Sequence, residues 1–97
     1  MTIWFVSRHP GALEWARRHD IGFDRHAAHL NLENVVTNDT VIGSLPVNSA
    51  ARVCEIGAQF FNLSLDLPAD ARGRELSADD LERYGARIER FDVRRKP

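Results

Sequence analysis

Hydrophobic and polar positions alternate along the chain in short runs that predict strands and helices in turn. Ile3–Val6 is an unbroken apolar run, too short for a helix and typical of a strand that is buried on both faces. After a turn that contains Pro and Gly, the helix formers from Ala12 to His19 predict a helix. Arg25–Leu30 indicates a second strand, and the β-branched run Thr40–Gly43 indicates a third.

A second helix is expected after residue 47. Either Asn48 or Ser49 can cap it, because both side chains accept hydrogen bonds from free backbone N–H groups. Its apolar stripe repeats at i, i+3, i+4 and i+7 and comprises Ala50, Val53, Cys54 and Gly57. This stripe favours Cys54 as a small buried apolar residue over a reactive thiol.

The remaining third of the chain predicts a strand, a loop, a helix and a last strand. Gln59–Leu65 alternates between apolar and polar positions, and Pro68–Glu75 is a polar loop. Ser77 opens an S-x-x-[DE] helix start, and this helix should run to about Tyr84. Arg87–Val93 can close the sheet as a charged edge strand, followed by a frayed tail.

Strands that alternate with helices predict an α/β fold with three layers and a mostly parallel sheet. The 97 residues leave room for one domain, so residues 1–97 are expected to form a single small unit. Ligands of such sheets bind outside the carboxyl ends of the strands, near a topological switch point. Two breaks follow strands in this way, at residues 7–11 and 44–48.

Charge and cysteine content narrow the classes of partner. Thirteen basic and fourteen acidic residues give a net charge of −1, so no overall positive field favours long nucleic acid or a membrane. All basic residues except Lys96 are Arg, which suits phosphate, although a codon bias explains the same excess. One cysteine excludes an internal disulfide, and a reducing cytoplasm is the expected compartment. Neither a signal peptide nor a membrane span is expected.

The segment Ser7-Arg8-His9-Pro10-Gly11 is the strongest candidate site. It joins a buried strand to a helix start, where free N–H groups attract phosphate. Arg8 can hold phosphoryl oxygens with two hydrogen bonds, His9 can move a proton near neutral pH, and Gly11 allows close backbone approach. The alternative is a capped turn with a solvated arginine.

Two further segments carry groups that suit a nucleotide. Ser44 and Asn48 can contact a base, a ribose or a phosphate, although Asn48 is equally an ordinary helix cap. Arg74 belongs to the segment Arg72-Gly73-Arg74-Glu75, which can cover a bound anion as a flap. The alternative for this segment is a solvated loop tied by weak Arg–Glu pairs.

The histidines do not predict a metal site. His26 and His29 are three residues apart, which places them on opposite faces of the predicted strand. No H-x-x-x-H or H-E-x-x-H motif occurs, so neither a metal nor another cofactor is expected. Asp24 and Arg25 are interpreted as structural residues.

Several segments together resemble the small Csx-sixteen family of type III CRISPR ancillary proteins. The resemblance spans nearly the whole chain, in order, and its most specific segments are SRHPGA and GSLPVN. It implies a Rossmann-like fold similar to that of CARF sensor domains, a homodimer, and the opening of cyclic tetra-adenylate to switch off antiviral signalling. The matching segments are residues 4–12, 24–26, 43–48, 63–68 and 72–76.

These residues fit a reaction in which a ribose 2′-hydroxyl attacks its own 3′ phosphate and expels the 5′ oxygen, without a metal. The product is a linear oligoadenylate ending in a 2′,3′-cyclic phosphate. The protein then supplies in-line geometry and charge stabilisation. We assign Arg8 to the equatorial phosphate oxygens and His9 to general base or general acid. The predicted ligand-binding residues are Ser7, Gly11, Ala12, Ser44, Asn48 and Arg74.

Three alternatives stay open. The protein can bind cyclic oligoadenylate without cutting it, or it can be a regulatory subunit without a nucleotide ligand. Arg8-His9 after the first strand is also similar to the Arg-His-Gly start of histidine phosphatases. In this chain Pro10 intervenes before the glycine, and the chain is short for that family's later Arg and His partners.

Overall fold

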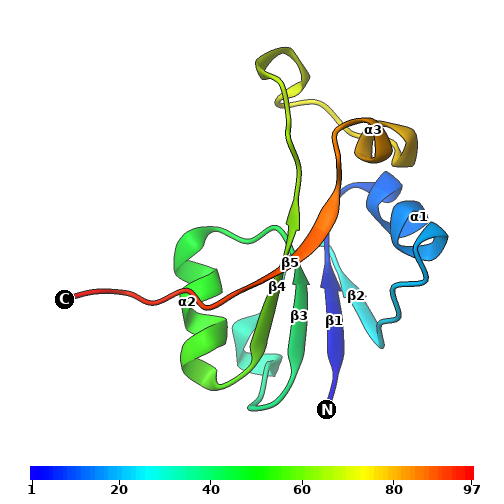
Figure 1. Cartoon of the computed structure of the whole chain (residues 1–97). Helices are drawn as coiled ribbons and strands as arrows, with labels where there is room; N and C mark the ends of the chain where they lie inside the picture. The colour runs from blue at the N-terminus through cyan, green and yellow to red at the C-terminus, as the bar shows by residue number, and fades with distance from the viewer.

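The computed structural model describes residues 1–97 and has the α/β arrangement that the sequence predicts (Figure 1). Helices and strands alternate along the chain, with two short 3₁₀ turns named η1 and η2 in the connections. The elements are β1 (Ile3–Val6), α1 (Pro10–Arg18), β2 (Arg25–Ala27), η1 (Leu32–Asn34), β3 (Thr40–Gly43), α2 (Val47–Ile56), β4 (Gln59–Ser64), η2 (Ala69–Ala71), α3 (Ala78–Arg83) and β5 (Arg87–Phe91).

The five strands form one sheet in the order β2-β1-β3-β4-β5. The strands from β1 to β4 are all parallel to one another, and β5 runs antiparallel to β4. The chain leaves β1 through α1 to reach β2 on one side, and then returns to β3 on the other side of β1. The topological switch point therefore lies between the carboxyl ends of β1 and β3.

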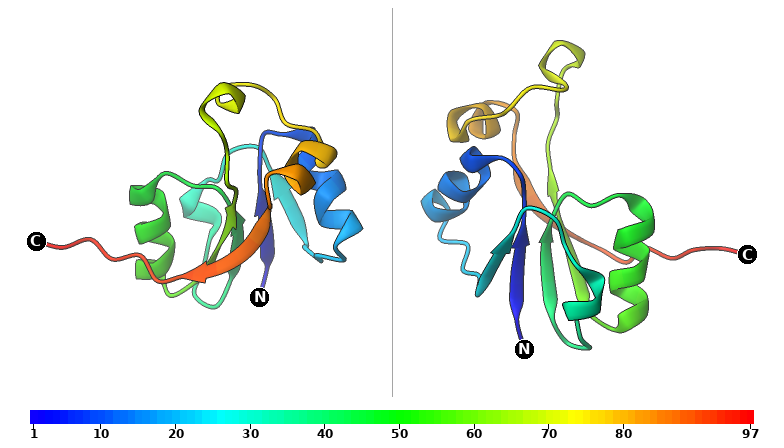
Figure 2. Two further views of the ribbon diagram at one scale, coloured as in Figure 1. Left: turned by 45° about the horizontal axis from the view of Figure 1, so that its top comes forward. Right: turned by 180° about the vertical axis from the view of Figure 1, so that it is seen from behind.

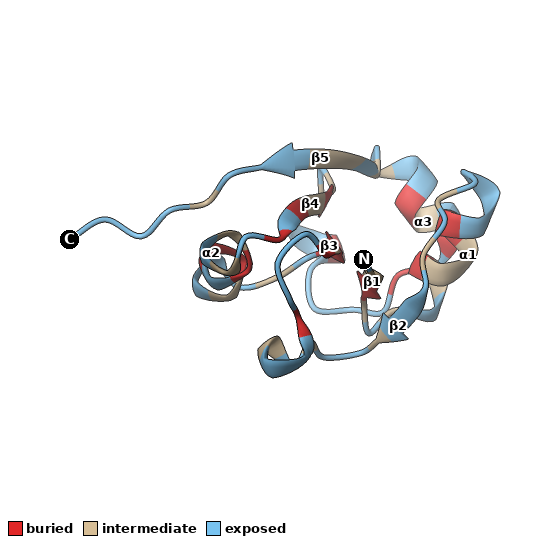
Figure 3. Ribbon diagram, turned by 90° about the horizontal axis from the view of Figure 1, so that it is seen from below, coloured by how far each residue is buried: buried red, intermediate tan, exposed pale blue.

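Helices cover both faces of the sheet, which confirms the three layers (Figures 2 and 3). On one face, Phe5, Ile42 and Leu63 of the sheet pack against Trp15 of α1 and Leu81 of α3. On the other face, the sheet packs against α2 and the η1 region, and the buried residues there are Val6, Val35, Val41, Ala50, Val53, Ala58 and Phe60. The three inner strands β1, β3 and β4 thus bury side chains on both faces, as the apolar run in β1 predicts, whereas the edge strands β2 and β5 have no fully buried residue.

Gly43 allows β1 and β3 to stay paired at the switch point. It pairs with Val6 in the parallel register, and a methyl group at this position would overlap the Val6 carbonyl oxygen. Only a residue without a side chain fits this close approach.

Most predicted boundaries are confirmed within two residues, but β2 is three residues shorter than expected. It ends at Ala27, which pairs with Val6, the last residue of β1. Because β2 is an edge strand with β1 as its one neighbour, its pairing stops where β1 stops. His29 therefore lies in a loop, and its predicted place on a strand face is wrong.

The helix ends confirm one predicted cap and correct another. Ser77 caps α3 through a reciprocal capping box with Asp80, as the S-x-x-[DE] motif predicts. The cap position of α2 is Pro46, so neither Asn48 nor Ser49 caps that helix.

Cys54 is half-buried beside the α2-side core, and its Sγ lies 3.5 Å from the Val93 nitrogen. None of the helices has the length and apolar character that crossing a membrane requires.

Candidate functional site

A groove of about 950 Å³ opens at the switch point, above the carboxyl ends of β1 and β3. Four connections line it: the β1–α1 turn, the segment after β2, the β3–α2 turn and the long β4–α3 loop. The β4–α3 loop extends beyond the sheet, with η2 at its tip (Figure 1). Two breaks that are far apart in the sequence, at residues 7–10 and 44–46, therefore meet in one groove, as expected for this fold.

Half of the groove lining is apolar. Leu63 and Leu65 come from the end of β4 and the residues after it, and Leu67 and Leu76 come from the β4–α3 loop. Such a surface suits the flat faces of an organic ligand, while a few polar groups fix its orientation.

The polar part of the lining is positively charged. The groove lining includes Arg8, His9, His29 and Arg74, and its one carboxylate is Glu75. Arg8 forms no hydrogen bond or ion pair, and the single hydrogen bond of Arg74 is a 3.4 Å contact to the Tyr84 hydroxyl. Elsewhere, carboxylates pair with arginines of the helices, of β5 and of the tail, namely Arg17, Arg18, Arg52, Arg87 and Arg94. The groove thus holds two arginines without a carboxylate partner, although the whole chain carries a charge of −1.

Hydrogen bonds from β2 fix the turn that carries Arg8 and His9. The Ser7 N–H donates to the Ala27 carbonyl at 3.0 Å, and His26 Nε2 donates to the Ser7 carbonyl at 3.0 Å. The Ser7 hydroxyl accepts the His9 N–H at 3.1 Å. The Ser7 side chain thus stabilises the turn from within.

The His9 ring is held by the segment that precedes α3. The backbone N–H of Leu76 donates to His9 Nδ1 at 3.5 Å. In the neutral ring this assigns the proton to Nε2, because one imidazole nitrogen accepts while the other donates. His9 in this state offers a hydrogen-bond donor to a ligand in the groove.

The motif Asp24-Arg25-His26 holds β1 along its length. The Asp24 carboxylate accepts the Ile3 N–H at 2.8 Å, and the Arg25 guanidinium lies 5.7 Å from the centre of the Trp4 ring. Together with the bond from His26 to the Ser7 carbonyl, these contacts explain the motif in structural terms.

The structure brings six of the eight predicted site residues to the groove: Ser7, Arg8, His9, Ala12, Ser44 and Arg74. The Ser44 hydroxyl, like that of Ser7, is used internally and donates to the Leu63 carbonyl at 3.0 Å. Ala12 is buried, and its N–H donates to the His9 carbonyl at 3.0 Å, so this group is not free for an anion. The start of α1 therefore offers fewer free N–H groups than the sequence suggests.

Gly11 and Asn48 do not line the groove. A side chain on Gly11 would overlap the backbone of residues 76–78, so this glycine permits the start of α1 to approach the start of α3. Asn48 is exposed on α2, and Ser49 lines the groove next to it.

Three polar groove residues, His29, Ser49 and Glu75, were not among the predicted site residues, although Glu75 belongs to the predicted flap segment. The position of His29 just after the second strand is a usable signal, because strand ends face the ligand in such folds. The flap segment shows none of the Arg–Glu pairs of the alternative interpretation, since neither Arg72 nor Arg74 forms an ion pair. No three His, Cys, Asp or Glu side chains gather closely enough to hold a metal ion.

A buried carboxylate lies at the other end of the strands, away from the groove. Asp39 precedes β3 and accepts hydrogen bonds from the Thr2 N–H, the Val36 N–H and the Trp4 indole N–H. Burial raises the pKa of Asp39, but these three hydrogen bonds outweigh burial and hold the pKa below its usual value. Its role is structural, because it joins the amino ends of β1 and β3.

Comparison with known proteins gives one family. Residues 4–94 match a family model described as "Putative CRISPR-associated protein (Cas_VVA1548)". Neither a curated protein nor a solved structure matches the chain.

Proposed function

The chain belongs to the CRISPR-associated family Cas_VVA1548, and on this premise we propose that it binds and linearises cyclic tetra-adenylate. The ring would lie in the groove at the carboxyl ends of β1 and β3. Its opening would remove the signal that sustains a type III CRISPR antiviral response.

The observation that carries this proposal is the charge of the groove. Arg8 and Arg74 come from two different connections, line the same groove and have no carboxylate partner. An arginine fork without an internal partner is free to bind phosphate oxygens bidentately. The groove volume of about 950 Å³ lies within the range of small-molecule sites, about 300–1,000 Å³, and accommodates part of a cyclic oligonucleotide.

In the proposed reaction the nucleophile belongs to the substrate. The 2′-oxygen attacks the adjacent phosphorus, the bond to the 5′-oxygen breaks, and a 2′,3′-cyclic phosphate forms. Arg8 binds the non-bridging oxygens, where negative charge grows in the transition state. His9 donates a hydrogen bond from Nε2 to the same phosphate, since its Nδ1 accepts the Leu76 N–H. Arg74 covers the ligand from the β4–α3 loop.

A homodimer would place two grooves around one cyclic tetra-adenylate ring. Cyclic tetra-adenylate has two-fold symmetry, and an isologous pair of chains presents each groove twice about one axis. Two copies of Arg8 and Arg74 would then surround the four phosphates of one ring.

The test is direct chromatography of the products. Purified protein is mixed with cyclic tetra-adenylate, with and without EDTA, and we expect linear products ending in a 2′,3′-cyclic phosphate in both samples. Arg8→Ala should lower the single-turnover rate at least about tenfold, because it removes transition-state charge stabilisation. Ring opening that disappears with EDTA would contradict the metal-independent mechanism.

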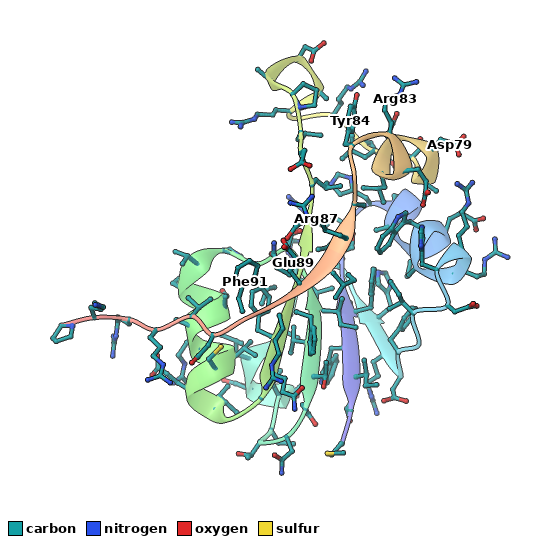
Figure 4. All side chains as sticks on the ribbon, viewed as in Figure 1. Asp79, Arg83, Tyr84, Arg87, Glu89 and Phe91 are labelled. Atoms are coloured by element: carbon teal, nitrogen blue, oxygen red, sulfur yellow. The ribbon has the colours of Figure 1, made fainter.

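The matched control is Arg83→Ala. Arg83 lies on α3, outside the groove, and forms no ion pair (Figure 4). Arg83→Ala changes the net charge by the same amount as Arg8→Ala but leaves the groove lining unchanged. The rate of this variant should therefore stay within about twofold of wild type. Equal losses in both variants would assign the effect to net charge and remove the role of Arg8.

Binding without cleavage is the second candidate, and one observation favours it. The His9 Nδ1 accepts the Leu76 N–H, which leaves the proton of the neutral ring on Nε2, so His9 in this state is not free to accept the 2′-hydroxyl proton. Single-turnover measurements with excess protein separate the two functions, since intact ligand recovered after hours would indicate sequestration.

A further inference from the structure

The four histidines of the chain differ in whether their ring nitrogens have partners within the chain. His19 pairs with Glu82 across the contact between α1 and α3. His26 Nε2 donates to the Ser7 carbonyl, and His9 Nδ1 accepts the Leu76 N–H. His29 forms no hydrogen bond or ion pair, is exposed, and lines the groove. It is the one imidazole with both nitrogens free for a ligand.

His29 reaches the groove from a wall different from that of His9. After β2, the chain arches over the carboxyl end of β1 towards η1, and residues 28–30 of this arch line the groove (Figure 2). His9 enters from the β1–α1 turn. Two imidazoles from different connections therefore line the groove in which the phosphate would lie.

We propose that His29 is the general base that takes the proton from the attacking 2′-hydroxyl. This inference rests on the proposed function and supplies the group that the predicted pair of Arg8 and His9 lacks. His9 with its proton on Nε2 donates to the phosphate but cannot accept there. His29 has no such constraint, because neither of its ring nitrogens has a partner within the chain, and one nitrogen of a neutral imidazole accepts a proton.

The proposed step balances without a co-reactant other than water. His29 takes the proton from O2′ as the bond between O2′ and phosphorus forms. The bond between phosphorus and O5′ breaks, and O5′ takes a proton from water in the open groove. The hydroxide so formed takes the proton that His29 holds, which restores the free imidazole. No net water is consumed, because the product is an isomer of the ring.

The charged and titratable groups that share the groove with His29 are Arg8, His9, Arg74 and Glu75. Glu75 is the competing proton acceptor, because it is the one carboxylate of the lining. The two candidates give different outcomes when each is replaced by glutamine, which keeps the size of the side chain and removes the base.

The experiment measures the dissociation constant and the single-turnover rate for cyclic tetra-adenylate in wild type, His29→Ala, His29→Gln and Glu75→Gln. We expect both His29 variants to lose about 10²-fold or more in rate, the usual contribution of a proton-transfer group, with affinity within about threefold of wild type. Added imidazole should restore part of the rate of His29→Ala, because a diffusible base fills the missing role. His19→Gln is the matched control, since His19 lies outside the groove, and its rate should stay within about twofold of wild type.

Three results would overturn the assignment. They are His29 variants within threefold of the wild-type rate, a loss that imidazole does not restore, and a loss confined to Glu75→Gln. If wild type opens the ring and the His29 variants do too, the inference alone fails. If wild type binds the ring and leaves it intact, or does not bind it, the proposed cleavage fails and the inference falls with it.

Discussion

Asp39 is the residue whose surroundings most tightly constrain its charge. Its two oxygens accept three N–H groups, and its side chain is almost fully buried, with 1% of the residue exposed. In Asp39→Asn, an amide NH₂ would replace one accepting oxygen and face a donor. We expect a loss of about 1–3 kcal/mol in the free energy of unfolding, measured with urea at pH 7, because buried donors lose their acceptor.

The same residue predicts how stability depends on pH. Its folded-state pKa is lowered, so Asp39 contributes stability that is fully present above its unfolded pKa of about 3.9. That contribution is lost as pH falls through the lower folded pKa. The difference in unfolding free energy between wild type and Asp39→Asn should therefore shrink below about pH 4. A difference that stays constant down to acid pH would show that the lost stability does not come from the ionised carboxylate.

The sequence allows two roles for Gly11, the approach of a phosphate or the close packing of backbone, and cannot distinguish them. A glycine at a helix start is compatible with phosphate approach, but here it admits the backbone of residues 76–78. Gly11→Ala should lower the unfolding free energy by about 1–3 kcal/mol, since backbone has to move to admit the methyl group. The control is Gly22→Ala, which has no atom within 4 Å of the new methyl group and should be neutral or slightly stabilising. Unchanged stability with weaker ligand binding in Gly11→Ala would favour the phosphate role instead.

At the scale of the elements, α3 is a short helix that depends on its cap. It has six residues, and the Ser77 hydroxyl accepts the Asp80 N–H while the Asp80 carboxylate accepts the Ser77 N–H. The backbone bond from Ser77 lowers the pKa of Asp80, which keeps this carboxylate ionised. The segment just before this cap provides the Leu76 N–H that holds His9, so the cap also supports the groove.

Ser77→Ala should cost about 0.5–2 kcal/mol, because the first turn of α3 loses an acceptor for its free N–H groups. Hydrogen exchange should accelerate first at the amides of α3 and of the residues before it. Thr37→Val is a suitable control, since it removes an exposed hydroxyl that bonds to the carbonyl of Ile56, the last residue of α2, and not to α3. Faster exchange spread evenly over the sheet would contradict a local role for the cap.

Local patterns predicted the elements, and their errors come from contacts between elements. The apolar run of β1, the stripe of α2 and the capping box of α3 each involve residues that are neighbours in sequence, so the pattern is sufficient. The end of β2 depends on the length of its partner β1. The pattern of residues 25–30 alone therefore cannot predict where β2 ends. The Nδ1 contact of His9 likewise depends on a residue 67 positions away.

At the scale of the whole molecule, the alternation of strands and helices predicted where the groove would lie. Both breaks at the switch point follow from the element order. The sequence also predicted Arg74 as a site residue, and Arg74 lines the groove. It did not predict that the loop after β2 brings His29 to the same groove, because the end of β2 and the path of this loop depend on contacts with β1.

The proposed homodimer makes a prediction about stoichiometry. If one ring lies across two symmetric grooves, calorimetric titration should give one cyclic tetra-adenylate for every two chains, and light scattering should give the mass of two chains. Each chain has a mass of 11.0 kDa, so the two states are well separated. One ring for each chain in a monomer would contradict the shared site, while leaving cleavage by a single groove to be tested with the same sample.

The placement of Asp39 at one end of the strands and of the groove at the other has a consequence for evolution and engineering. The hydrogen bonds of the carboxylate that secures the strands involve none of the residues that line the groove. Replacements at exposed loop positions can then accumulate without weakening the scaffold. A library confined to the exposed residues 28, 29, 46, 72, 74 and 75, which leaves the buried loop residues Ala71 and Leu76 unchanged, should yield many folded proteins with altered ligand preference.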